Sequence, residues 1–71
     1  MIDMPEDLDD AIALFDEKSA ALDAAVKAVE EEQARGRSGV TAYSRAAMLQ
    51  HALRDFGQRL QARISQELEK L

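Results

Sequence analysis

The chain has 71 residues and no cysteine, so it forms one small domain at most, without disulfides or a thiolate metal site. A core of this size supplies about 3–5 kcal/mol unless another chain associates with it. The net charge of −5 argues against nucleic-acid binding, because affinity for the phosphate backbone comes largely from clustered lysines and arginines. No apolar run is long enough to cross a membrane, so we expect no membrane insertion and a cytoplasmic location.

Residues 5–35 are predicted to form the first helix. Asp3 and Glu6 resemble a capping box, and Pro5 suits the first helical turn, whereas residues 1–4 are expected to fray. The large apolar residues alternate at spacings of four and three, which is typical of a helix that faces another helix. This predicted seam consists of Leu8, Ile12, Phe15, Leu22, Val26 and Val29, with Ser19 in the remaining position.

The only clear break lies at residues 36–39. Gly36 can adopt the left-handed conformation that ends many helices, and Ser38 or Thr41 can cap a second helix over residues 40–70. The apolar stripe of this second helix is Ala42, Ala46, Leu49, Leu53, Phe56, Leu60, Ile64, Leu68 and Leu71. Gly57 lies just beside the stripe, and either a close approach or simple tolerance explains it. A connection this short makes the helices antiparallel neighbours, so the predicted fold is all-α, a coiled-coil-like two-helix hairpin.

Folding at this break brings together residues whose numbers sum to about 75. The resulting pairs include Phe15–Leu60, Leu22–Leu53, Val26–Leu49 and Val29–Ala46. Residues 1–35 carry eleven acids and three bases, a net charge of −8, and residues 36–71 carry three acids and six bases, a net charge of +3. The two halves are therefore expected to attract each other, with Arg63 and Lys70 near the acidic start of the first helix.

A second apolar line runs along the first helix beside the seam, formed by Leu14, Ala21, Ala25 and Ala28. The two lines together span about 200° of the helix surface, roughly twice what one neighbouring helix covers. A contact with another chain is therefore predicted through this line. Val40, Tyr43 and Ala47 form a smaller patch at the start of the second helix, which either extends the partner surface or covers the loop.

The sequence offers little support for catalysis or metal binding. His51 is the only histidine, and it projects to the far side of the second helix from Leu53, so a catalytic or metal role would need a partner from another chain. Residues 30–32 are three glutamates, but consecutive helical side chains point about 100° apart and cannot converge on one ion. We therefore expect no catalytic residue, metal, cofactor or small-molecule substrate.

The layout resembles the small co-chaperones of type III secretion needle subunits. The matching features are Arg35-Gly36 at the turn, Tyr43 early in the second helix, and the stretch from Leu49 to Leu60. This resemblance implies a cytoplasmic protein that pairs with a larger tetratricopeptide-like helical chaperone. The two together would keep a needle subunit soluble before its export.

Self-association is the alternative that the same apolar surface supports. Two hairpins could pack through the Leu14 line into a four-helix bundle, as a homodimer or as a filament or needle-type subunit. The Pro/Asn-containing turn expected of needle subunits is not found at residues 36–39. In both interpretations the chain acts by binding another protein chain.

Overall fold

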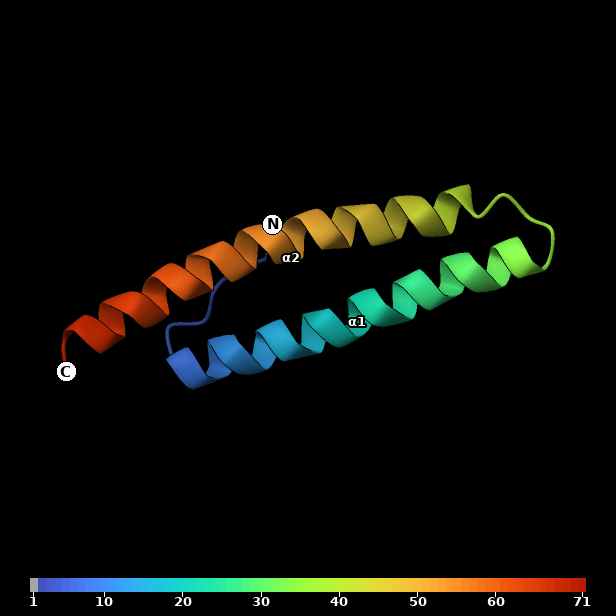
Figure 1. The fold of residues 1–71 in the computed structure, drawn as a ribbon. Coiled ribbons are helices and arrows are strands. Elements are labelled where there is room, and N and C mark those ends of the chain that lie inside the picture. The colour runs from blue at the N-terminus through green and yellow to red at the C-terminus, as the bar shows by residue number, and fades with distance from the viewer. Residues whose placement is uncertain (1) are drawn as a thin grey trace.

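The computed structural model describes residues 2–71, which form two α-helices and, over that range, no strand. Helix α1 spans Leu8–Ala34 and helix α2 spans Val40–Glu69. They run antiparallel in a rod of 54 × 15 × 15 Å, and the end of α2 projects beyond the start of α1 (Figure 1). Because the two helices pack against each other, the predicted all-α hairpin is confirmed.

Helix α1 begins three residues later than predicted, at Leu8 instead of residue 5. Its cap is Asp7, whose Oδ1 accepts a hydrogen bond of 3.1 Å from the backbone N–H of Asp10. The prediction that Asp3 caps the helix and that Pro5 occupies its first turn is therefore wrong. Asp7 satisfies one of the free N–H groups of the first turn, and the acids that follow it lie at the positive end of the helix dipole.

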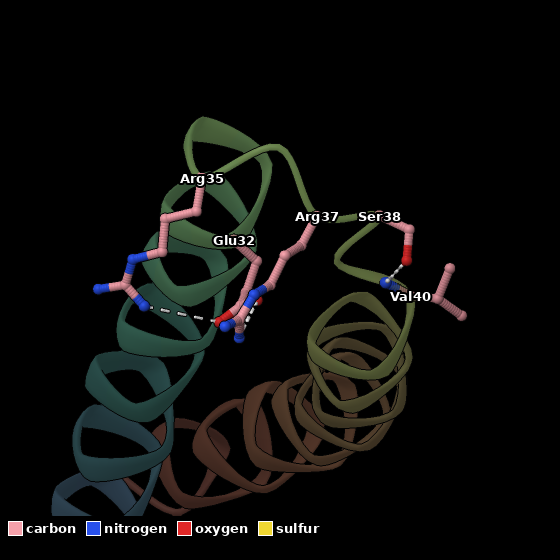
Figure 2. A network of polar contacts seen from close by, with 5 residues as sticks. All are labelled: Glu32, Arg35, Arg37, Ser38 and Val40. Atoms are coloured by element: carbon pink, nitrogen blue, oxygen red, sulfur yellow. Dashed lines mark hydrogen bonds and ion pairs between the residues drawn. The ribbon is translucent and has the colours of Figure 1, made fainter.

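The turn after α1 forms largely as predicted. Gly36 adopts the left-handed conformation, with φ of +79°, and Arg37 N–H donates to the carbonyl of Glu32 at 3.0 Å. The Glu32 carboxylate also lies 3.8 Å from Arg35 and 3.3 Å from Arg37 (Figure 2). One acid thus holds both arginines of the turn and fixes its conformation.

Helix α2 starts after Gly39, whose φ of +70° favours glycine because it is strained for other residues. The prediction that Ser38 or Thr41 caps this helix is wrong, because the cap residue is Gly39 and no side chain caps it. Ser38 lies one residue earlier. Its Oγ accepts a hydrogen bond of 3.4 Å from Val40 N–H (Figure 2). Thr41 lies inside the helix instead.

The buried core is small, and Phe56 lies at its centre with no exposed surface. Ala11 and Leu60 complete the buried cluster around Phe56, and Phe15 packs against this cluster. The Phe15 ring stacks on the Phe56 ring, with centroids 6.3 Å apart and planes 16° apart. A Cβ on Gly57 would lie 3.1 Å from Cε2 of Phe15, so a close approach explains this glycine.

The inward face of α1 is rotated from the predicted seam. The seven-residue repeat of inward positions consists of Leu8, Ala11, Phe15, Lys18, Leu22, Ala25, Val29 and Glu32. Ala11 has no exposed surface, whereas Ile12 is 38% exposed and Val26 is 43% exposed. Placing Ile12 and Val26 in the seam was therefore wrong. The methyl group of Ala11 leaves room for the large Phe56 ring, so a small residue faces the bulkiest part of the core.

Residues 2–5 form a strap across the two helices at their open end (Figure 1). Ile2 and Met4 pack against the buried cluster. The guanidinium of Arg59 donates to the carbonyl of Ile2 at 2.8 Å, and that of Arg63 donates to the carbonyl of Pro5. Fraying was predicted for residues 1–4, and for residues 2–4 this was wrong; Met1 lies outside the described residues.

The ion pairs are local. Within residues 2–71 they join Arg35 and Arg37 to Glu32, Arg59 to Asp55 and Lys70 to Glu67. None of these pairs connects α1 with α2, so the opposite charges of the two halves produce no interhelical ion pair in this range. Arg63 lies near the start of α1, as expected, but it donates to the backbone carbonyl of Pro5 in the strap. Lys70 was expected there too, whereas it pairs with Glu67 at the projecting end of α2.

Candidate partner-binding faces

The hairpin has two broad faces, one on each side of the plane that contains both helices. Residues seven apart lie on the same side of such a packed helix. The open face carries Ile12, Ser19 and Val26 from α1 and Tyr43, Ala47 and Gln50 from α2. Val26, Tyr43, Ala47 and Gln50 line one groove between the helices, which places them on one side.

The opposite side is the strap face. It carries Leu14, Ala21 and Ala28 from α1 and Arg45, Ala52 and Arg59 from α2. Ala28 and Arg45 line a common groove beside the turn. Arg59, on the same side of α2, holds the strap at the other end of the rod.

The core can be reached from the open face. Phe15, Leu22 and Leu53 line a groove together with Gly57, although they belong to the inward seam of the two helices. Nearer the turn, Val29 and the buried Ala46 line a second groove together with Tyr43, which is 65% exposed. The open face is therefore an apolar seam that side chains of this hairpin cover incompletely.

The strap face differs from the open face at both ends of the rod. At the open end of the hairpin, Ile2, Met4 and Leu14 all pack against the same buried cluster. At the turn end, charged side chains of Glu32, Arg37 and Arg45 line the groove. The chain thus covers one end of this face itself and surrounds the other with polar groups.

The predicted partner residues do not form one surface. Leu14 is half-buried against the core, Ala21 is exposed on the strap face, and Ala25 is half-buried in the inward seam. Ala28 and Val40 line the groove beside the turn, whereas Tyr43 and Ala47 line the groove of the open face. The structure therefore separates the predicted set into two groups on opposite sides of the hairpin.

Two residues of the open face escaped the sequence analysis. Ile12 and Val26 were assigned to the interior because the large apolar residues of this helix alternate at spacings of four and three, yet both are more than a third exposed. The sequence carries no local signal for their position, because Ile12, Ser19 and Val26 repeat as regularly as Ala11, Lys18 and Ala25 and include the larger apolar residues.

The described residues offer few groups for chemistry. His51 is exposed on α2, and no group of three or more histidines or acids in residues 2–71 could hold a metal ion. Glu30 borders the open face while Glu32 binds the arginines of the turn, so the glutamates of residues 30–32 diverge as predicted. Neither helix of this range has an apolar segment long enough to cross a membrane.

In comparisons with known proteins, no family model, curated protein or solved structure matches the chain. The resemblance to needle-subunit co-chaperones therefore stays a prediction that depends on Arg35-Gly36, Tyr43 and the stretch from Leu49 to Leu60. The shape and surface of the hairpin are the remaining basis for inferring function.

The exposed surface of the hairpin is large for its mass. The solvent-accessible surface is 5464 Å². A compact monomer of 7.9 kDa is expected to expose about 4,400 Å². The excess of about 1,000 Å² is comparable to the roughly 800 Å² that each partner buries in a standard protein interface.

Proposed function

We propose that the chain is a non-enzymatic helical interaction module whose open face docks on a helix of another protein. The observation that carries this proposal is the apolar seam that remains accessible along one side of the hairpin. A helix lying in this seam between α1 and α2 would complete a three-helix arrangement, a common way to bury an apolar groove.

The gain in stability from such docking is large relative to that of the hairpin. Burying a Val, Ile or Phe side chain fully contributes about 1.5–3 kcal/mol. Val26 and Tyr43 are 43% and 65% exposed, and Phe15 and Leu22 border the same side. A hairpin of this size has about 3–5 kcal/mol of its own. Binding therefore stabilises the module as well as its partner.

The more specific form of this proposal is a cytoplasmic co-chaperone of a type III secretion needle subunit. The resemblance at the turn and in α2 supports it, and the exposed position of Tyr43 agrees with a role in binding. In this role a larger helical chaperone supplies the docking helix. The two proteins together hold the aggregation-prone subunit before export.

The general proposal is tested with a neutral helical probe. The probe is a fluorescein-labelled three-heptad peptide with Leu at the a and d positions and Gln elsewhere, used at nanomolar concentration so that it does not self-associate. Fluorescence anisotropy with the full chain should show saturable binding. Val26→Glu should weaken it at least tenfold, because it places a charge in the apolar groove, whereas the matched change Ala21→Glu on the strap face should leave it unchanged. Equal effects of the two changes would refute docking on the open face.

The specific proposal needs its natural components. A needle subunit and its larger helical chaperone are co-expressed with the full chain or without it, and the soluble subunit is quantified. We expect the chain to raise the soluble amount and Val26→Glu to abolish the increase. A soluble amount that does not depend on the chain would contradict the co-chaperone role and leave the general proposal standing.

A further inference from the structure

We infer that the open face selects a basic amphipathic helix, one whose apolar stripe is flanked by a row of lysines or arginines. This inference rests on the proposed function and adds the chemistry of the partner. It follows from the charged residues that border the open face and from the length of the apolar groove.

A row of four acids lies along the outer edge of the open face. Asp9, Asp16, Asp23 and Glu30 are spaced seven residues apart in α1, so they share one side of the helix at intervals of about 10.5 Å. All four are exposed, and Glu30 lines the same groove as Val26 and Tyr43. None of the four takes part in the ion pairs formed within residues 2–71. The row therefore borders the open face with uncompensated negative charge, and Glu30 lines a groove of that face directly.

The other edge of the open face is almost uncharged. At the corresponding seven-residue positions α2 carries Ala47, Arg54, Gln61 and Leu68, with one base among them. A helix in the groove consequently meets acids on one flank and mainly neutral side chains on the other. Complementary charges fix the orientation and register of such a helix and exclude acidic competitors.

A second copy of this chain fits the face poorly. Its own open face is bordered by the same acidic row, and each copy has a net charge of −5. Joining two open faces therefore adds like charges, with Arg54 as the one base available on each α2 border. A basic helix of a different protein neutralises the row instead. The exposed apolar positions of α1 on the open face, from Ile12 to Val26, extend over about 21 Å of the helix, which corresponds to an apolar stripe of about four helical turns.

The test compares charged versions of the neutral Leu/Gln peptide. In one version the flanking e and g positions are Lys, and in the other they are Glu. For the unmodified chain we expect the Lys peptide to bind at least tenfold more tightly than the Glu peptide at low salt. We expect the preference to shrink as salt rises, because exposed charges are screened.

Two charge-reversal variants separate the acidic row from net charge. Asp16→Lys with Asp23→Lys alters the row, and Glu17→Lys with Glu31→Lys makes the same change in net charge on other exposed positions of α1. The first variant should lose the preference for the Lys peptide, because the two new lysines cancel the two acids that remain in the row, and the second should still prefer the Lys peptide. Circular dichroism verifies that both remain helical.

Three results would overturn the inference. If both variants lose the preference equally, the effect comes from net charge and the acidic row does not select the partner. If the three peptides bind the open face equally well, the docking function stands but its charge selectivity is wrong. Light scattering addresses the second copy: a mass near twice 7.9 kDa that Val26→Glu reduces to the monomer would identify that copy as the occupant.

Discussion

Replacing Phe56 by alanine tests whether the core is centred where the structure places it. Phe56 has no exposed surface, lies in one cluster with Ala11 and Leu60, and stacks on Phe15. Truncating a fully buried Phe to Ala costs about 3–5 kcal/mol. This equals the total of about 3–5 kcal/mol expected of a core of this size. The variant should therefore be largely unfolded at 25 °C in the absence of a partner.

Replacing Phe56 by alanine should also weaken the contacts that hold the strap. The guanidinium of Arg59 lies 5.6 Å from the centroid of the Phe56 ring while it donates to the carbonyl of Ile2. Without the ring, Arg59 loses a cation–π contact worth about 0.5–1 kcal/mol at an exposed site. Amide hydrogen exchange of residues near the strap should consequently become faster in the Phe56→Ala variant.

The assay is urea unfolding followed by far-UV circular dichroism. Met48→Ala is the control, because Met48 is 73% exposed on the same helix and its loss should change the free energy of unfolding by less than about 0.5 kcal/mol. A Phe56→Ala protein that still unfolds cooperatively and loses less than about 1 kcal/mol would refute a core centred on Phe56.

Two further substitutions test local features of the helices. Asp7→Ala should lower the free energy of unfolding by about 1 kcal/mol through loss of the cap, and Asp3→Ala, which lies before the helix, should have almost no effect; equal losses in urea titrations would contradict the observed helix start. Gly57→Ala gains about 1 kcal/mol in an unhindered helix interior. Here the gain should be absent, since the new Cβ would press on the Phe15 ring at 3.1 Å, and a full gain in thermal unfolding experiments would argue against the close approach.

The fold could be predicted from the sequence because several independent signals agreed. The apolar spacing, the single break at residues 36–39 and the left-handed Gly36 all favoured two antiparallel helices. The end of α1 and the start of α2 were located closely for the same reason. Helix termini marked by glycine are strong local signals, which need no knowledge of the tertiary contacts.

The exact orientation of α1 could not be predicted because it depends on what the partner helix presents. Judged by size, Ile12 is a better core residue than Ala11. Phe56 on the facing helix reverses this preference, because its ring fills the space beside the small side chain of Ala11. The prediction considered each helix by its own periodicity, whereas the packing matches a large residue on one helix with a small one on the other.

The strap escaped prediction for a different reason. Residues 2–5 have no helical or strand periodicity, so only tertiary contacts order them: Ile2 and Met4 on the core, and two arginine side chains on backbone carbonyls. Long-range contacts of this kind leave no pattern in the local sequence. As a consequence Leu14, which had been assigned to a partner surface, packs within its own chain.

The most direct test of docking on the open face is chemical-shift mapping of the ¹⁵N-labelled chain with the neutral Leu/Gln peptide. We expect the largest amide shift changes at Ile12, Ser19 and Val26 of α1 and at Tyr43 and Ala47 of α2. Changes confined to Leu14, Ala21, Ala28 and Ala52 would place the binding surface on the strap face and contradict the account.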